Sequence, residues 1–348
     1  MGSIELKNIT KSYDNKKNVI EDLNLKIPDG SFTVLIGPSG CGKTTTLRLI
    51  VGLEEPTSGE VYIDDKSMEK VEPGDRDIAM VFQNYALYPT MNVRENIEFG
   101  LINNKVKKEE RDKLVTEIAE IVGLEDFLQK KPGELSGGQR QRVALARAMV
   151  KKPKVFIMDE PLSNLDAKLR AQMRIELSEL HQKMNTTFVY VTHDQTEAMS
   201  MATNIILMND GAIQQHDTPE KLYEDPANLF TAEFIGSPSM NTYEINEIPD
   251  YNPPIPEAKY VGFRPSAAEF ILNSTSEKMN KNDLIIKVKI ITREYLGSEI
   301  IYNCESGFGK VYFKTFQKED VSDENEITLY LPEQKLFYFD EEGKRVHI

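Results

Sequence analysis

The segment GPSGCGKT at residues 37–44 constrains this chain most, because it fits the pattern G-x-x-x-x-G-K-[ST]. An apolar run, SFTVLIG, comes before it, and KTTTLRLIVGL after it has helical spacing. A glycine-rich turn between a buried strand and a helix offers backbone N–H groups and the positive helix end to a phosphate. Lys43 should then reach the β- and γ-phosphates of a nucleotide, and the Thr44 hydroxyl should ligate Mg²⁺. A chance glycine turn is the alternative, and it is disfavoured because motif and context agree.

Two further motifs place acid–base chemistry beside this turn. The apolar run KVFIMDE ends in Asp159, which could hold Mg²⁺, and Glu160, which could orient or deprotonate an attacking water. A solvated strand end has the same pattern, so the acidic pair indicates nucleotide hydrolysis only when combined with the glycine-rich turn. His193 ends another apolar run, YVTH, and parallel strands ending on one sheet edge would bring it near Glu160 and the γ-phosphate. A purely structural role is the alternative for His193.

Composition and charge limit the classes of partner. The chain has 348 residues, of which 40% are hydrophobic and 28% charged, with a formal net charge of -14. Because an acidic chain is repelled by phosphate backbones, we expect no nucleic-acid partner. The two cysteines are far apart and unpatterned, which is typical of a reducing compartment. The sequence shows neither a membrane span nor a signal peptide, so we expect a cytoplasmic protein linked to a membrane only through a partner.

Residues 1–235 are predicted to form an α/β domain. Apolar runs such as IAMVFQ, TTFVYVTH and NIILMNDG alternate with helical patterns, which indicates a mostly parallel sheet covered on both faces. Residues 89–152 are helical in pattern without a strong strand, and we expect a helical insertion there. The segment NLDAKLRAQMRIELSELHQKM is predicted to be an amphipathic helix. The apolar residues expected near one face of this helix are Leu169, Met173, Ile175, Leu177 and Leu180.

Residues 236–348 are predicted to form a separate, small all-β domain. The proline-rich segment IPDYNPPIPEAK follows Gly236 and breaks the α/β pattern. Short β-type runs come after it, namely LIIKVKII, EIIYNCE, KVYFKTF, EITLYLP and KLFYFD. Their spacing and turn residues favour a barrel or sandwich. The segment QKEDVSDENE is expected to be a solvated acidic loop.

A second glycine-rich helix start lies in LSGGQRQRVALARA, Leu135–Ala148, although one nucleotide needs only one such turn. Together the motifs resemble the ATP-binding subunits of ABC transporters over the whole of residues 1–235. In that family two subunits pair head to tail, so each ATP lies between the glycine-rich turn of one copy and the LSGGQ of the other. The resemblance therefore implies a homodimer. The residues implied to act on the ATP of the partner copy are Ser136, Gly137, Gly138 and Gln139.

The resemblance implies a P-loop NTPase fold and assigns further roles within an ATP and Mg²⁺ site. Tyr13 in KSYD is at the position that stacks on adenine, Gln83 in VFQ is the Q-loop glutamine, and Asp166 in SNLD belongs to the D-loop. Glu160 and His193 become the catalytic residues. The implied ATP-binding residues are Tyr13, Gly37, Pro38, Ser39, Gly40, Cys41, Gly42, Lys43, Thr44, Thr45 and Gln83. The implied ligands of Mg²⁺ are Thr44, Gln83 and Asp159.

Two regions resemble the ATPases of maltose and multiple-sugar importers in particular. One is VFQNYALYPTMNVRENIEFGL, and the other is the tail, where VGFRPSAAEF, REYLGSEIIYNC and KLFYFDEEGKRV are similar to an OB-type regulatory domain. The resemblance implies sugar or oligosaccharide uptake at the inner face of a membrane, with two transmembrane permease subunits and an extracytoplasmic solute-binding protein. It also implies dimerisation through the tail. A permease helix would dock on Tyr85, Leu87 and Tyr88, although side chains of this kind are as often part of a core.

Three alternatives remain open at this stage. The same two-domain plan serves importers of polyamines, ferric iron, sulfate or molybdate. A soluble ABC ATPase that acts on DNA or ribosomes is disfavoured, because those usually carry two cassettes or basic surfaces. A purely regulatory binding module is disfavoured by the presence of both Glu160 and His193.

Overall fold

A six-stranded sheet forms the centre of the first of two units, Met1–Pro219 and Glu220–Ile348. The structure is a computed structural model that describes residues 2–14, 16–271, 280–316 and 326–347. The strand order of the sheet is β10-β9-β3-β8-β7-β6, and all neighbours run parallel except β10 and β9. Its strands are β3 (Phe32–Ile36), β6 (Ile78–Val81), β7 (Val155–Asp159), β8 (Thr187–Val191), β9 (Asn204–Asn209) and β10 (Ala212–Asp217).

The central strands of this sheet are apolar along their whole length. Every residue of β3 and β8 is buried, and so is β7 except for its last residue, Asp159. Strands covered on both faces need no alternation of polar and apolar side chains. The prediction of a mostly parallel sheet is therefore confirmed, and Asp159 is the point where strand β7 leaves the core.

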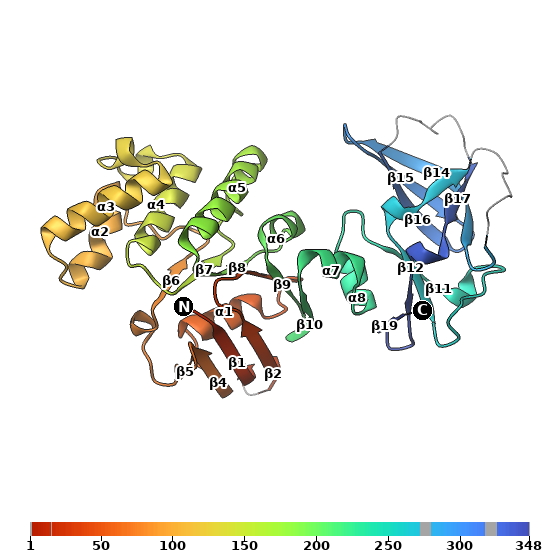
Figure 1. Cartoon of the computed structure of the whole chain (residues 1–348), viewed down its shortest axis with the longest axis horizontal. Coiled ribbons are helices and arrows are strands. Elements are labelled where there is room, and N and C mark those ends of the chain that lie inside the picture. Colours follow the sequence, from red (N-terminus) through yellow and green to blue (C-terminus); the bar gives the residue numbers. More distant parts are fainter. Residues whose placement is uncertain (1, 15, 272–279, 317–325, 348) are drawn as a thin grey trace. The chain divides into compact units, whose positions relative to one another are not determined.

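A second, antiparallel sheet lies in the same unit and was not predicted from the sequence. Its order is β2-β1-β4-β5, and helix α1 (Lys43–Val51) lies between the two sheets (Figure 1). Side chains from both sheets and from α1 form one core that includes Leu6, Leu47 and Val189. The four strands are β1 (Ile4–Ser12), β2 (Asn18–Ile27), β4 (Ser58–Ile63) and β5 (Lys66–Ser67).

Helices fill the interval between β6 and β7, where a helical insertion was expected. They gather beyond the edge strand β6 (Figure 1). Asn92 caps the first of them in a capping box with Glu95, and Gly123 ends the second with φ 64°. The α-helices are α2 (Val93–Asn103), α3 (Lys108–Val122) and α4 (Gly137–Met149). Two 3₁₀ turns, η2 (Glu125–Phe127) and η3 (Pro132–Glu134), lie in the same interval, and a third, η1 (Pro73–Asp75), lies before β6.

Helix α5 (Ala167–Met184) follows β7, and the short helix α6 (Gln195–Met201) follows β8. The predicted apolar face of α5 is correct for Met173, Leu177 and Leu180, which are buried. It is wrong for Ile175, which is 63% exposed. Ile175 follows Met173 by two residues, about 200° around the helix, so it points to the opposite side.

The second unit contains two antiparallel sheets, which confirms the predicted all-β tail. Their strand orders are β11-β12-β18-β19 and β13-β17-β14-β15-β16. The first sheet comprises β11 (Asn241–Glu244), β12 (Tyr260–Phe263), β18 (Leu336–Phe339) and β19 (Arg345–Val346). The second comprises β13 (Glu269–Ile271), β14 (Leu284–Tyr295), β15 (Ile300–Ser306), β16 (Gly309–Thr315) and β17 (Glu326–Leu331). Most of the predicted acidic loop, residues 317–325, lies outside the described residues.

Short helices precede these sheets, and they explain why the second unit begins before the expected boundary at Gly236. The buried Arg264 guanidinium donates to the carbonyl of Tyr223 at 2.7 Å, to that of Ala232 at 2.9 Å, and to that of Ile235. One arginine of the β domain thus holds the preceding helical segment against it. The helical elements of the unit are α7 (Pro219–Glu224), α8 (Leu229–Phe234), η4 (Ile245–Glu247), η5 (Pro265–Ala267) and η6 (Glu333–Lys335).

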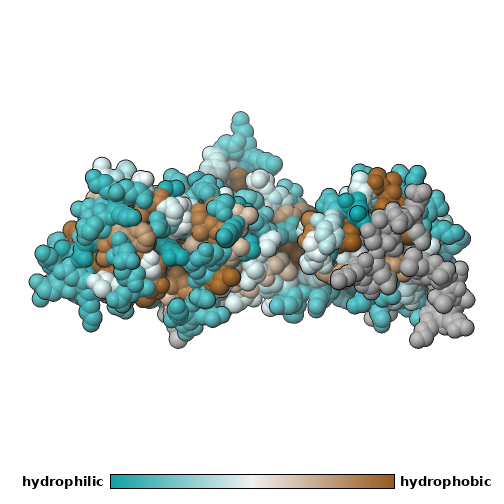
Figure 2. Space-filling view, turned by 90° about the horizontal axis from the view of Figure 1, so that it is seen from above, coloured by the Kyte–Doolittle hydropathy of each residue, from teal (hydrophilic) through white to brown (hydrophobic). Residues whose placement is uncertain are grey.

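The surface is mixed in polarity. The face shown in Figure 2 is largely hydrophilic, with small hydrophobic areas between the polar ones. Within the described ranges, none of the helices is both long and apolar enough to cross a membrane.

Candidate functional site

The glycine-rich turn joins β3 to α1 through three left-handed residues. Gly37, Gly40 and Gly42 have φ of 155°, 82° and 104°. A Cβ at Gly37 would lie 2.1 Å from the carbonyl oxygen of Met208, so the close approach of β9 requires glycine there. The turn therefore leads directly into α1, and its N-cap residue Gly42 makes no side-chain capping hydrogen bond.

The Lys43 side chain is folded into this turn. It is buried, and its Nζ donates to the carbonyls of Gly37 and Pro38, both at 2.8 Å. Its ammonium lies at the positive end of α1, where an anion would be attracted. Tyr13 lies beside the same helix start, with its Oη 3.3 Å from Thr45 Oγ1 and its side chain 56% exposed. The turn, the lysine and an exposed aromatic ring thus meet in one place.

A cluster of polar side chains surrounds Glu160, directly after β7. His193 Nδ1 lies 3.3 Å from Glu160 Oε2, and Gln83 Nε2 lies 3.5 Å from the same oxygen. Gln83 Nε2 also lies 3.2 Å from Ser163 Oγ. The structure therefore brings together the three residues that the sequence placed at the ends of β6, β7 and β8. An acid and an imidazole at this distance can hold and move a proton.

The charge of the acidic pair is not fully balanced by the protein. Burial raises the pKa of Asp159, and the neighbouring Glu160 carboxylate raises it further, while Arg48 and Lys43 act in the opposite direction. A divalent cation would remove this penalty. The expected ligands Thr44, Gln83 and Asp159 would bind a metal through oxygen atoms, which Mg²⁺ prefers. Water and phosphate oxygens would complete its coordination shell. In the described part of the chain, no group of three or more His, Cys, Asp or Glu side chains could hold a metal by itself.

The second glycine-rich helix start is built as a capped helix. Ser136 Oγ accepts from the N–H of Gln139 at 3.3 Å, and Gln139 Oε1 accepts from the N–H of Ser136 at 2.8 Å. A Cβ at Gly138 would lie 3.0 Å from Leu169 Cδ1 on α5. In the described chain no hydrogen bond joins Ser136–Gln139 to residues 37–45.

The glycines of this segment also have a packing role that sequence reasoning missed. A Cβ at Gly137 would lie 3.0 Å from Leu165 Cδ2, as close as the Gly138 position lies to Leu169. Asp166 lies between these leucines and caps α5, because its Oδ1 accepts from the N–H of Leu169 at 3.0 Å. The missing side chains at Gly137 and Gly138 thus let α4 approach the D-loop of the same chain.

The three residues expected at a docking groove differ in exposure. Tyr85 is only 6% exposed, whereas Tyr88 is 39% exposed and Leu87 is half-buried. In this structure the Tyr85 ring belongs to the core, as the alternative interpretation allowed. Phe82, also 39% exposed, is an additional surface aromatic that the sequence analysis did not single out. The sequence signal that could have identified Phe82 is its position directly before Gln83.

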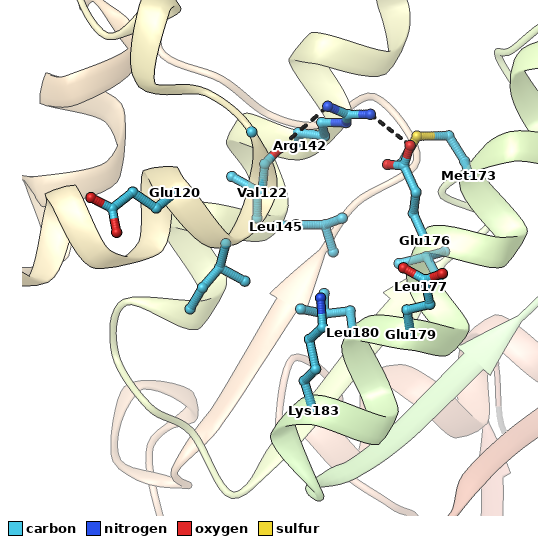
Figure 3. A pocket seen from close by; sticks show the side chains of 12 residues that line it. Glu120, Val122, Arg142, Leu145, Met173, Glu176, Leu177, Glu179, Leu180 and Lys183 are labelled. Atoms are coloured by element: carbon cyan, nitrogen blue, oxygen red, sulfur yellow. Dashed lines mark hydrogen bonds and ion pairs between the residues drawn. The ribbon is translucent and has the colours of Figure 1, made fainter.

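A separate pocket of about 260 Å³ lies between α3, α4 and α5 (Figure 3). Leu145, Leu177 and Leu180 contribute to its apolar part. Arg142 crosses its edge, donating to the carbonyl of Val122 at 3.4 Å and to Glu176 at 2.6 Å. None of the residues predicted for the ATP site lines this pocket, so it is a gap between the helical insertion and α5.

Comparisons with known proteins give the family. Residues 20–163 match the family described as ABC transporter. The oligosaccharides import ATP-binding protein MsmX of Bacillus subtilis (strain 168) is 46% identical over 359 residues, which cover 98% of each chain. The sn-glycerol-3-phosphate import ATP-binding protein UgpC of Bartonella bacilliformis is 57% identical over 241 residues, 69% of this chain and 70% of that protein.

Solved structures agree with this similarity. The dimeric, post-hydrolysis structure of the ATP-binding cassette MJ0796 with ADP and Pi has a TM-score of 0.56 and 36% sequence identity, over 62% of this chain and 98% of that one. Similarity to MsmX covers 98% of this chain and therefore includes both units, whereas similarity to the cassette covers 62% of it. The chain belongs to the ATP-hydrolysing, ATP-binding proteins of the ABC transporter family.

Proposed function

We propose that this ATPase energises the import of a sugar or oligosaccharide. The observation that carries the proposal is the 98% coverage of the oligosaccharide import protein MsmX, because that similarity includes the tail as well as the ATPase unit. Import of sn-glycerol-3-phosphate is the second candidate, and it rests on the 57% identity to UgpC. That similarity covers 69% of this chain, so it says less about the tail.

In the proposed reaction, Lys43 and the glycine-rich turn bind the β- and γ-phosphates, and Tyr13 stacks on adenine. Thr44, Gln83 and Asp159 hold Mg²⁺, which when bound neutralises charge on the phosphates. Glu160 orients or deprotonates the attacking water. The support is geometric, since the Glu160 carboxylate is shared by Gln83 and His193 within 3.5 Å.

We further propose a head-to-tail homodimer in which Ser136–Gln139 of each copy contacts the ATP of the other. Two facts support this arrangement: the LSGGQ turn makes no hydrogen bond to the glycine-rich turn within the described chain, and MJ0796 is dimeric. The residue ranges 1–235 and 236–348 would then serve as nucleotide-binding and dimerisation domains. Two permease subunits and an extracytoplasmic solute-binding protein complete the importer, with this chain at the inner face of the membrane.

Replacing Glu160 by Gln tests the catalytic part of the proposal. The variant should bind ATP and hydrolyse it about 10²- to 10⁴-fold more slowly, because only the proton acceptor is lost. Size-exclusion chromatography with ATP should then show a trapped dimer. Glu179→Gln, an exposed change on α5, is the matched control and should hydrolyse ATP at the normal rate. Near-normal turnover by Glu160→Gln would remove Glu160 from the base role.

The cargo is tested by uptake in cells that lack this gene. Loss of labelled oligosaccharide uptake, with sn-glycerol-3-phosphate uptake retained, is the expected result. Restoration by the wild-type gene but not by the Glu160→Gln gene would link the transport defect to ATP hydrolysis. The reverse pattern of uptake would favour the second candidate.

A further inference from the structure

Arg170 on α5 contacts two catalytic loops that are separate in the sequence. Its Nη2 donates to the carbonyl oxygen of Leu165 at 3.0 Å, in the turn just before Asp166. Its Nη1 lies 3.5 Å from Asp194 Oδ2, next to His193. One guanidinium therefore joins the D-loop to the loop that carries the histidine.

The second acidic contact of this arginine is a buried carboxylate. Glu197 on α6 is 3% exposed, and its Oε2 accepts from Tyr190 Oη at 2.8 Å and from Thr192 Oγ1 at 2.7 Å. Its Oε1 faces Arg170 Nε at 3.9 Å. Arg170 thus places a guanidinium beside a buried carboxylate whose other oxygen is held by two hydroxyl groups.

These contacts fix the loop on both sides of His193. Thr192 comes directly before the histidine and is held by Glu197, while its Oγ1 accepts from the N–H of Asp194 at 3.0 Å. Asp194 comes directly after it and caps α6, accepting from the N–H groups of Thr196 at 2.7 Å and Glu197 at 3.3 Å. The backbone of His193 is thus held by residues that all contact Arg170 directly or through Glu197.

We propose that Arg170 is a positioning residue for ATP hydrolysis. It fixes the position of His193 relative to the D-loop. The inference rests on the proposed role of His193. In the proposed dimer Ser136–Gln139 contacts the ATP of the partner, and Gly137 of this segment packs on Leu165, whose carbonyl Arg170 binds. Arg170 would therefore link this contact with the partner to the position of His193 beside Glu160. In the described chain Arg170 Nε has no hydrogen-bond acceptor at present, and a small shift of α6 toward α5 would supply Glu197 as one.

The test is steady-state ATP hydrolysis by the full chain carrying Arg170→Gln. Turnover, kcat, should fall about tenfold or more, because a catalytic group displaced by 1 Å can lose about 10² in rate. The KM for ATP should stay within about twofold, since Arg170 does not touch the glycine-rich turn. Arg170→Lys keeps the charge but not the fork that reaches Leu165 and Asp194 together, so its kcat should be intermediate. Arg174→Gln, the same substitution one turn along α5, is the matched control.

A double variant separates positioning from a general loss of stability. Glu197→Gln alone should also lower kcat, and Arg170→Gln combined with Glu197→Gln should be no slower than the worse single variant, because both act through one contact. The proposal would be overturned if the losses of kcat in the two single variants multiplied in the double variant. A normal kcat for a folded Arg170→Gln chain would also overturn it, and so would a KM that rises as kcat falls. If Arg170→Gln does not fold, a normal kcat for Arg170→Lys overturns it instead. His193→Ala is measured in parallel: normal turnover there would refute the role of His193, independently of the result at Arg170.

Discussion

Glu160 has an unusual backbone conformation that aims its carboxylate. Its φ is 44°, in the left-handed region that residues other than glycine rarely adopt. Its N–H still donates to the carbonyl of Val191 at 3.0 Å, so the ladder between β7 and β8 holds the backbone while the chain turns. Sparsely populated conformations persist where surrounding structure fixes them, and they are common at functional sites. The turn directs Glu160 toward Gln83 and His193 rather than along the strand.

Asp159→Asn should stabilise the protein when nucleotide is absent. Because burial and Glu160 raise the pKa of Asp159 in the folded chain, ionisation of this carboxyl disfavours folding. Its contribution to the free energy of unfolding is present at low pH and is lost as pH rises through the raised pKa. At neutral pH the variant should gain no more than about 1 kcal/mol, since solvent screens this partly exposed group.

Urea unfolding from pH 4 to pH 8 measures the effect of Asp159→Asn. The exposed Asp126→Asn variant is the control and should track the wild-type curve. In the presence of Mg²⁺ and ATP the order should reverse, because the amide is a weaker ligand than the carboxylate. A variant less stable than wild type without nucleotide would contradict the assignment of an unbalanced acidic pair.

At single positions, the sequence was most informative where a motif specifies the backbone. The motif at residues 37–44 predicted a glycine-rich turn between a strand and a helix. The structure shows this turn, and the close approach of Gly37 to Met208 explains one of its glycines. Exposure was less predictable, because aromatic residues are common both in cores and on docking surfaces. Tyr85 and Tyr88 differ by three positions and have opposite environments, and only tertiary packing decides which ring is buried.

Among the secondary-structure elements, α1 is held at both ends. Its N-terminus follows the glycine-rich turn, and its C-terminal carbonyl groups accept hydrogen bonds from Arg76, which precedes β6. The guanidinium donates to the carbonyls of Leu49 at 3.1 Å and Ile50 at 3.0 Å, the last turn of the helix. It also donates to the carbonyls of Met68 at 3.1 Å and Val71 at 3.0 Å. A cation suits the negative end of a helix dipole, so Arg76 ties α1 to the strand that leads to Gln83.

Arg76→Gln should lower the free energy of unfolding by about 2 kcal/mol, because hydrogen bonds from a charged donor are strong and the carbonyls lose their partner. Arg48→Gln is the matched control on α1: its side chain is half exposed and its nearest carboxylate is 3.9 Å away, so a loss of about 0.5 kcal/mol or less is expected. Urea unfolding of both variants gives the comparison. Equal losses at the two positions would show that the four carbonyl contacts do not act as a clamp.

Elements were predictable where their pattern was uniform. The parallel strands are continuous apolar runs, and α5 shows a helical period with one error at Ile175. The antiparallel sheet was missed because β1 and β2 bury single apolar residues between polar ones, and register shifts interrupt the alternation. The helix start at Ser136 was predicted, but its packing on Leu165 and Leu169 was not, since those contacts join segments distant in sequence.

On the scale of the whole molecule, the segment 82–88 runs from the polar cluster around Glu160 to exposed aromatic residues of the α/β unit. Asn164 Nδ2 donates to the carbonyl of Gln83 at 2.9 Å, which fixes one end beside the acidic cluster. Arg147 donates to the carbonyls of Tyr85 at 2.9 Å and Ala86 at 2.7 Å, in a turn where both residues have positive φ. Because one arginine of α4 holds this strained turn, a movement of α4 can change the conformation of the turn. A partner seated on this segment would then be linked energetically to nucleotide state.

The last prediction concerns that partner, the proposed permease. Combined Phe82→Ala and Tyr88→Ala should prevent co-purification with it, because truncating a central aromatic anchor commonly loses about 2 kcal/mol or more of binding. Both rings are 39% exposed, whereas Tyr85 is 6% exposed and its Oη has no hydrogen-bond partner among the described residues. Tyr85→Phe is therefore the control: it should assemble normally and unfold no more easily than wild type.

Two measurements decide between docking and core roles for the exposed rings. The affinity of the purified chain for ATP should be unchanged in the double variant, because neither ring belongs to the glycine-rich turn. Its thermal stability should fall only slightly, since Tyr88 packs on Phe99 with ring centroids 4.7 Å apart and loses that contact. Normal assembly and transport by the double variant would refute the docking assignment. Loss of ATP binding together with assembly would place these rings in the core of the subunit, and the coupling between segment 82–88 and a permease would then have no structural basis.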